Sequence, residues 1–400
     1  SSITIKEGAN LGNSGITNNS NIGTLKVYES VKYTGNGSDR ITQDLEVAQN
    51  KTLTVGSNGT LSFNSKNGSV NNLGTIAGNL SNVSNSTLGT FINSGTINGN
   101  INNEGTITSI DNSGVITGEI VSGSSGQTSQ IDKIINTGTI GTAKTKVATF
   151  KTLVASNQDV SSNFSDAISL NTITTTEISN GGLINGNIRV KGQSDIQELN
   201  NTDTIAGCII LEGGKIGNIN NTNGAIANCM QFSNGANVDN LNNSGTIKDK
   251  ITNDSGSITV NNSGSGSIGE IITSNGGNTN ISNGKNGHID LITNTGSNST
   301  TNIIEWNAGN ADNPNNPIKV AGDNLGGINT GTIYVDVTPG KVYDVEQIVT
   351  DGNGSGVDSS GDSLADQLNN GQGIFDSLDT ISGIFDFVDE GNGKYSVGLD

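Results

Sequence analysis

One short phrase recurs along most of this 400-residue chain. It reads apolar, any residue, Asn, any residue, Gly, Thr, Ile, and clear copies span residues 70–76, 91–97 and 241–247. The Gly position advances by 21 residues in each step from 182 to 203, 224 and 245, with Asp203 taking the place of Gly in its copy. A fixed period is a strong constraint on the fold, because every copy must then form the same structural unit.

A period near 21 residues indicates a coil of short β-strands. Helical-hairpin repeats need about 33 to 47 residues, and leucine-rich repeats need a leucine framework that this chain lacks. Like residues of stacked coils lie about 4.8 Å apart, so we expect the recurring Ile to form an interior column. The members of this column are expected to be Ile76, Ile97, Ile116, Ile140, Ile184, Ile205, Ile226, Ile247, Ile289 and Ile333, with Ile268 displaced by two residues.

The Asn two residues before the Gly predicts a second column. Stacked amides can hydrogen-bond along such a column, and Asn and Gly both tolerate the left-handed backbone of a tight corner. The chain has only three prolines, as expected if backbone N–H groups pair between coils. The predicted column comprises Asn72, Asn93, Asn112, Asn136, Asn180, Asn201, Asn243, Asn262 and Asn329.

Together these patterns predict an all-β fold, a right-handed parallel β-helix with a partly helical C-terminal cap. Residues 1–69 are expected to form irregular opening coils, residues 70–345 the regular repeats, and residues 346–400 the cap or a linker. The repeat is interrupted near residue 160 and at residues 307–316, where we expect an irregular coil or protrusion and a loop, respectively.

Composition argues against two classes of partner. The chain has 19 basic and 37 acidic residues and a net charge of −18, so we expect no nucleic-acid partner. No segment approaches the roughly 18 continuous apolar residues of a membrane-spanning helix, so we expect no membrane insertion by these residues. If the protein is exported, its secretion signal is expected outside this sequence.

Tandem phrases such as Asn242-Asn243-Ser244-Gly245-Thr246-Ile247 resemble the passenger domains of Gram-negative autotransporters, including the adhesin and vacuolating-cytotoxin-like groups. The likeness covers about residues 70–340. The resemblance implies an extracellular location on the bacterial surface, with attachment to the outer membrane through a domain outside this sequence, or release from the cell. It also implies contact with a host-cell receptor or glycan, or with β-helices of neighbouring bacteria.

We therefore expect a non-enzymatic adhesin, acting on host cells or in bacterial self-association. A cytotoxin-like effector is the first alternative, and it would need an apolar pore-forming segment that the sequence lacks. A polysaccharide-acting enzyme is the second, and it predicts a cluster of Asp, Arg or Lys on one outer face. Arg occurs only as Arg40 and Arg189.

The second interruption of the repeat supplies candidate binding residues. Loops often carry binding residues, and Trp306 is the only tryptophan of the chain. An exposed Trp could anchor a partner, whereas packing of Trp306 within the loop is the alternative. The candidates are Trp306, Asn307, Asn310 and Asp312.

Two cysteines, Cys208 and Cys229, are separated by one repeat of 21 residues. Equivalent positions of adjacent coils should place their Cα atoms about 5 Å apart, within the range of a disulfide. The pair is either a disulfide or two stacked core residues.

An Asp/Gly/Ser-rich stretch near the C-terminus loosely resembles a calcium loop. Its candidate ligands are Asp351, Asn353, Ser355 and Asp362, with Gly356 at the sixth position. Position 12 is Asp rather than Glu and no helix is expected before the loop, so a linker is the alternative. No other cofactor is expected.

Overall fold

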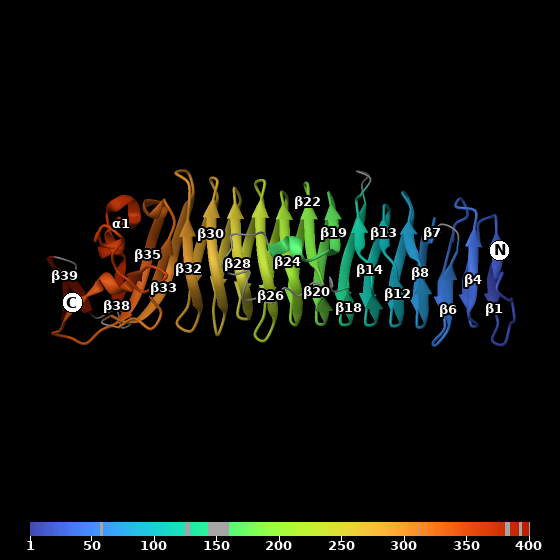
Figure 1. Ribbon diagram of the computed structural model, residues 1–400, viewed down its shortest axis with the longest axis horizontal. Helices are drawn as coiled ribbons and strands as arrows, with labels where there is room; N and C mark the ends of the chain where they lie inside the picture. Colours follow the sequence, from blue (N-terminus) through green and yellow to red (C-terminus); the bar gives the residue numbers. More distant parts are fainter. Residues whose placement is uncertain are drawn as a thin grey trace. The chain divides into compact units, whose positions relative to one another are not determined.

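The structure is a computed structural model that describes residues 1–56, 59–124, 129–142, 160–311, 313–380, 385–391 and 394–399. The chain divides into two compact units, Ser1–Gly217 and Asn218–Asp400. The fold is mostly β, a parallel β-solenoid with coils of about 21 residues, as the repeat predicts. Within each unit the strands stack in chain order (Figure 1). The right-handed sense of the coil stays a prediction.

Coils of the first unit build three parallel ladders of strands. The first ladder contains β1 (Ile3–Ile5), β3 (Leu25–Val27), β5 (Leu45–Val47), β8 (Lys66–Asn72), β11 (Thr87–Asn93), β14 (Thr106–Asn112), β17 (Gln130–Asn136), β20 (Thr174–Asn180) and β23 (Asp195–Asn201). The second contains β2 (Ile16–Asn18), β4 (Val31–Gly35), β6 (Thr52–Val55), β9 (Thr75–Ala77), β12 (Thr96–Asn98), β15 (Val115–Ile116), β18 (Thr139–Ile140), β21 (Leu183–Ile184) and β24 (Thr204–Glu212). The third contains β7 (Thr60–Phe63), β10 (Asn79–Asn82), β13 (Ile101–Asn103), β16 (Ile120–Ser122), β19 (Asp166–Asn171) and β22 (Asn187–Lys191), and it joins the second in β24.

The second unit continues this pattern with longer strands, and β25 (Lys215–Asn221) contains the boundary between the units. One ladder contains β27 (Asn237–Asn243), β29 (Ser257–Asn262), β31 (Asn278–Asn283), β33 (Thr300–Asn310), β35 (Ile328–Asp336) and β38 (Leu378–Thr380). The other contains β26 (Ile226–Ser233), β28 (Thr246–Asp254), β30 (Ser267–Ser274), β32 (His288–Asn294), β34 (Ile318–Ala321) and β37 (Val349–Thr350).

The C-terminal part contains one short helix, α1 (Leu364–Gly371), which packs against η3 (Leu325–Gly327) and β35. The hydroxyl of Ser363 caps α1 by accepting the N–H of Asp366. Three strands form a separate antiparallel sheet, β36 (Val342–Asp344), β40 (Lys394–Leu399) and β39 (Phe385–Gly391). The described residues also form the 3-10 turns η2 (Val160–Asn163), η4 (Val345–Ile348) and η5 (Phe375–Ser377).

The predicted Ile column is confirmed over most of its length. Ile76 pairs with Ile97, and the column continues in register through Ile116 and Ile140. All four side chains are fully buried, so each coil covers the apolar face of the next. A single coil would leave these side chains in water, which explains why the repeat must be tandem.

Three predicted members of the column were placed wrongly, and the first two are Ile226 and Ile268. Ala227, not Ile226, pairs with Ile247 and faces the interior. Ile268 lies in register with Ile247 and is not displaced, because the extra residues are taken up in the preceding corner, where the Gly266 N–H donates to the Ser263 carbonyl. Corners therefore absorb insertions without disturbing the strands.

The predicted Asn column is a continuous amide ladder in each unit. Asn93 Nδ2 donates to Asn112 Oδ1 at 2.7 Å, and equivalent bonds along the ladder are 2.7 to 2.9 Å long. Each amide also donates to a corner carbonyl, such as Gly114 O for Asn112. The ladder comprises Asn72, Asn93, Asn112, Asn136, Asn180 and Asn201 in the first unit, and Asn221, Asn243, Asn262 and Asn283 in the second.

A shorter amide ladder fills another corner of the first unit. Asn82 donates to Asn103 Oδ1, and Asn103 donates to Ser122 Oγ, at 2.8 and 3.0 Å. The close spacing of the phrase at residues 91–97 and 101–107 has this origin, because the two copies form successive corners of the same coil.

Two predicted column positions near the C-terminal end of the ladder, Asn329 and Ile333, are wrong. Asn329 is not an interior amide, since it pairs with Asn302 and donates to Asn302 Oδ1 at 3.0 Å on the half-buried outer side of the strands. Ile333 pairs with Trp306 instead of continuing the Ile column.

Replacing a ladder amide should destabilise the fold far more than replacing its outward neighbour. Asn243→Ala removes the acceptor of Asn221 and the donor to Asn262, and we expect the free energy of unfolding to fall by about 1–3 kcal/mol. Asn242→Ala on the same strand is the control, and it should change stability by less than about 0.5 kcal/mol. Urea denaturation measures both, and equal losses would contradict an energetic role for the ladder.

Candidate functional site

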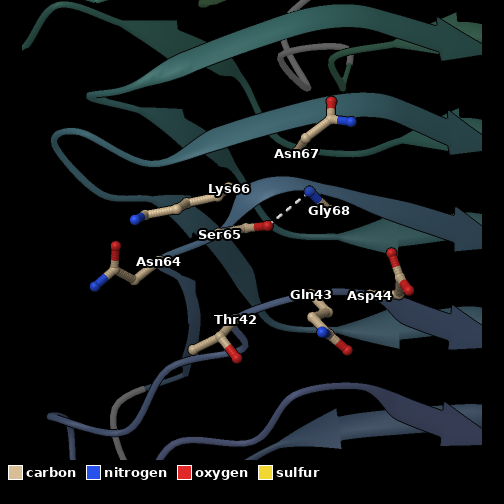
Figure 2. A pocket seen from close by; sticks show the side chains of 8 residues that line it. All are labelled: Thr42, Gln43, Asp44, Asn64, Ser65, Lys66, Asn67 and Gly68. Carbon is tan, nitrogen blue, oxygen red and sulfur yellow. Dashed lines mark hydrogen bonds between the residues drawn. The ribbon is translucent and has the colours of Figure 1, made fainter.

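A polar recess of about 570 Å³ lies in the first unit. Two neighbouring segments line it, residues 42–44 and residues 64–68 (Figure 2). The lining consists of Thr42, Gln43, Asp44, Asn64, Ser65, Lys66, Asn67 and Gly68, without an aromatic or large apolar side chain.

The recess opens because two successive strands differ in length. Strand β8 begins at Lys66, whereas β5 beneath it begins only at Leu45, which pairs with Val70. Four residues of β8 therefore precede its pairing with β5. Asp44 replaces a ladder bond with its side chain, as its Oδ1 accepts the Ser69 N–H at 2.9 Å.

A bulge in β8 presents the exposed side chains of the recess. Lys66 pairs with Thr87 and Gly68 with Leu88, so Asn67 is the extra residue, and it has a left-handed φ of 81°. Ser65 Oγ fixes the bulge by accepting the Gly68 N–H at 2.6 Å, the bond marked in Figure 2.

The exposed polar groups of the recess are available to a ligand. Within the described residues the side chains of Asn64, Lys66 and Asn67 form no hydrogen bond or ion pair. Asn64 and Lys66 extend toward the same side in Figure 2. Amides both donate and accept hydrogen bonds, so this surface suits a ligand with many hydroxyl groups. The sequence did not predict this recess, because no local motif marks a difference in length between successive strands.

The predicted binding residues around Trp306 do not form an exposed site. Trp306 lies on β33, is fully buried, and donates from Nε1 to the Asn316 carbonyl at 2.8 Å. The expected loop is shorter than predicted, since β33 runs to Asn310 and pairs with β35. Asn307 is half-buried and Asn310 exposed, and Asp312 lies outside the described residues.

The region around residue 160 is partly regular. Residues 166–171 and 174–180 form β19 and β20, which pair within the coils of the first unit. The irregular region expected near residue 160 is therefore shorter than predicted on its C-terminal side. Residues 143–159 lie outside the described residues.

Both cysteines are buried within strands, Cys208 on β24 and Cys229 on β26. Neither is a free thiol. They belong to different units, so their pairing with each other stays a prediction.

The candidate calcium ligands fall into two separate turns. Asp351 Oδ1 accepts the N–H groups of Ser355 and Asn353, and the bond from Ser355, then that from Asn353, hold the pKa of Asp351 below its ordinary value. Asp362 instead donates its N–H to Asp358 Oδ1. In the part of the chain that the structure describes, no group of three His, Cys, Asp or Glu residues could hold a metal ion.

Charged residues do gather on one outer face of the first unit. Arg189 Nε bonds Asp166 Oδ2 at 2.8 Å, and the Arg189 guanidinium also bonds Glu212. Asn187 occupies the other oxygen of Asp166. A hydrolytic pair needs two carboxyl groups facing the substrate, and here Asp166 is engaged on both sides. The arrangement is an ion-pair network.

Glu119 lies beside this network and lines a hollow of about 190 Å³ with Asp166. Burial, and then the negative charge of Asp166, raise the pKa of Glu119 from 4.5 to about 7. Glu119 therefore changes charge near neutral pH.

Comparisons with known protein families, curated proteins and solved structures found no match for this chain. Among the described residues, no helix has the length and apolar character needed to cross a membrane.

Closing the recess from inside should destabilise the first unit. A Cβ at Gly68 would stand 1.8 Å from the main-chain oxygen of Gln43, and we expect Gly68→Ala to cost about 1–3 kcal/mol. Gly181→Ala is the control, because its Cβ would meet no atom closer than 3.5 Å. Thermal unfolding compares the two, and an unchanged Gly68→Ala protein would contradict the close approach of the two segments.

The raised pKa of Glu119 predicts a pH dependence of stability. Between pH 4.5 and about 7 the folded state binds more protons at Glu119 than the unfolded state does, so the free energy of unfolding should rise as the pH falls through this window. Glu119→Gln should remove this increment and should unfold at a higher temperature than the parent protein at about pH 8. The control is Glu7→Gln at an exposed carboxyl, and the same pH profile for Glu119→Gln and the parent would refute the assignment.

Proposed function

We propose that this chain is a non-enzymatic adhesin of a bacterial surface that binds neutral glycans in the recess at residues 42–44 and 64–68. The observation that carries the proposal is the set of exposed polar side chains that have no partner among the described residues, Asn64, Lys66 and Asn67, beside Gln43. Sugar hydroxyls donate and accept hydrogen bonds at every position around the ring. Amide and ammonium groups at the rim of a hollow complement such a ligand.

The outer face of the second unit supports the same chemistry on a larger surface. On β27, β29 and β31 the outward side chains are mainly Asn, Ser and Thr, with Asp239 the charged one. Asn242 donates to Asn220 and Asn261 donates to Asn242, at 2.9 and 3.0 Å. These mutual bonds orient the amides before a ligand arrives, which lowers the entropy cost of binding.

Export to the cell surface is part of the proposal. The Asn-Ser-Gly-Thr-Ile phrase and the solenoid that it builds support it, because the phrase resembles that of autotransporter passengers. A surface protein that binds sugars weakly at each site gains avidity when many copies act together.

A glycan array with the whole chain tests the proposal. We expect binding to neutral oligosaccharides, and we expect Asn64→Ala/Lys66→Ala to weaken it at least about tenfold, a loss of about 1.4 kcal/mol. Lys285→Ala/Asn286→Ala removes the same residue types from an exposed turn of the second unit and should bind like the parent. Equal affinity of both variants would place the binding elsewhere, and a parent protein that binds no glycan would refute the function.

A further inference from the structure

A second hollow of the first unit, of about 250 Å³, contains an acidic group instead of amides. It lies between residues 33–40 and β7, and Tyr33, Asp39, Arg40 and Ser62 are among its lining residues. Asp39 is only 8% exposed and Tyr33 only 2%. A carboxylate this deeply buried normally has a partner for each oxygen.

Among the described residues, only one oxygen of Asp39 has such a partner. Tyr33 donates its hydroxyl hydrogen to Asp39 Oδ2 and accepts a hydrogen bond from Asn18 Nδ2 at 3.0 Å. Burial, and then the bond to Asp39, raise the pKa of Tyr33 above its ordinary value, so the phenol remains a donor. Within the described residues, Asp39 Oδ1 accepts no hydrogen bond, although it lines the hollow.

The neighbouring arginine does not neutralise this carboxylate. Arg40 Nη1 donates to the main-chain oxygens of Gly37 and Asp39, both at 2.9 Å, and not to the Asp39 side chain. The negative charge of Asp39 therefore lacks a counter-ion in the described part of the unit.

The loop is built to hold Asp39 in this position. Asn36 Oδ1 accepts the N–H groups of Ser38 and Asp39, and Gly37 has a left-handed φ of 86°. A Cβ at Gly35 would stand 2.2 Å from Asp39 Oδ1, so position 35 requires glycine because the Asp39 carboxylate packs directly against it.

We propose that this hollow binds a primary ammonium group, with Asp39 Oδ1 as the acceptor of its hydrogen bond. The proposal goes beyond glycan binding in the recess and does not depend on it. A charged N–H donor supplies the missing partner and the missing counter-charge together. An amino sugar and a lysine side chain both carry this group. The hydroxyl of Ser62 also lines the hollow, and it suits the hydroxyl groups of an amino-sugar ring.

Isothermal titration of the whole chain with glucosamine and with Nα-acetyl-lysine amide tests the proposal and separates the two sources. N-acetylglucosamine and glucose share the sugar ring but lack the ammonium group, and we expect them to bind at least tenfold more weakly than glucosamine. Binding of glucosamine alone would identify an amino-sugar site, and binding of both amines would identify a general ammonium site.

Asp39→Asn should abolish amine binding, because the amide keeps an acceptor for Tyr33 but carries no charge. Asp195→Asn, at an exposed carboxylate of β23, should bind like the parent. Ser62→Phe fills the hollow and leaves the carboxylate in place, so it tests the site even if Asp39→Asn does not fold. Loss of amine binding in Ser62→Phe would support the proposal.

Three results would overturn it. These are no binding of either amine, amine binding that Asp39→Asn retains, or binding of Ca²⁺ alone that depends on Asp39. Neutral oligosaccharides are titrated into the same samples, so that failure of the ammonium site is distinguished from failure of the glycan recess.

Discussion

The hydrogen bond between stacked asparagine amides is the interaction on which the rest of the fold depends. Along the interior ladder, Nδ2 groups are directed at the Oδ1 atom of the next coil, as in Asn93 to Asn112 at 2.7 Å. This bond accepts only one register, because a shift by one residue would turn the amide outward and its outward-facing neighbour inward. The apolar columns supply burial, but they tolerate sliding more readily than a directional bond does.

Departures from regularity begin where this ladder is absent. Its first amide, Asn72, pairs in register with Val47, and Asn72 Oδ1 is buried without a partner among the described residues. At the other end, Asn283 pairs in register with Trp306. Both proposed binding hollows lie in the coils at or before Asn72, where strand lengths are free to differ and loops such as residues 36–40 interrupt the stack.

The sequence was enough to predict the solenoid and most of its interior, because a tandem repeat reports the same environment many times. Errors arose where a corner changed length. Two extra residues in the corner after Asn221 moved Ala227 into the place assigned to Ile226, and two extra residues in the corner after Asn262 kept Ile268 in register. Trp306 was expected beside a loop at residues 307–316, either exposed or packed, and the structure buries its indole, which donates to the Asn316 carbonyl. Local composition could not reveal that packing.

The candidate sites were not predictable in the same way, and the reason is physical. Inward positions are constrained by the coils on either side, whereas outward positions and corners can vary at little cost to stability. The groups that hold Asp39 come from three segments, because Tyr33 on β4 and Asn36 in the loop bond Asp39, and Asn18 on β2 bonds Tyr33. Such a cluster has no spacing that recurs. In a solenoid the repeat therefore encodes the scaffold, and binding specificity has to be sought in the residues that break the repeat.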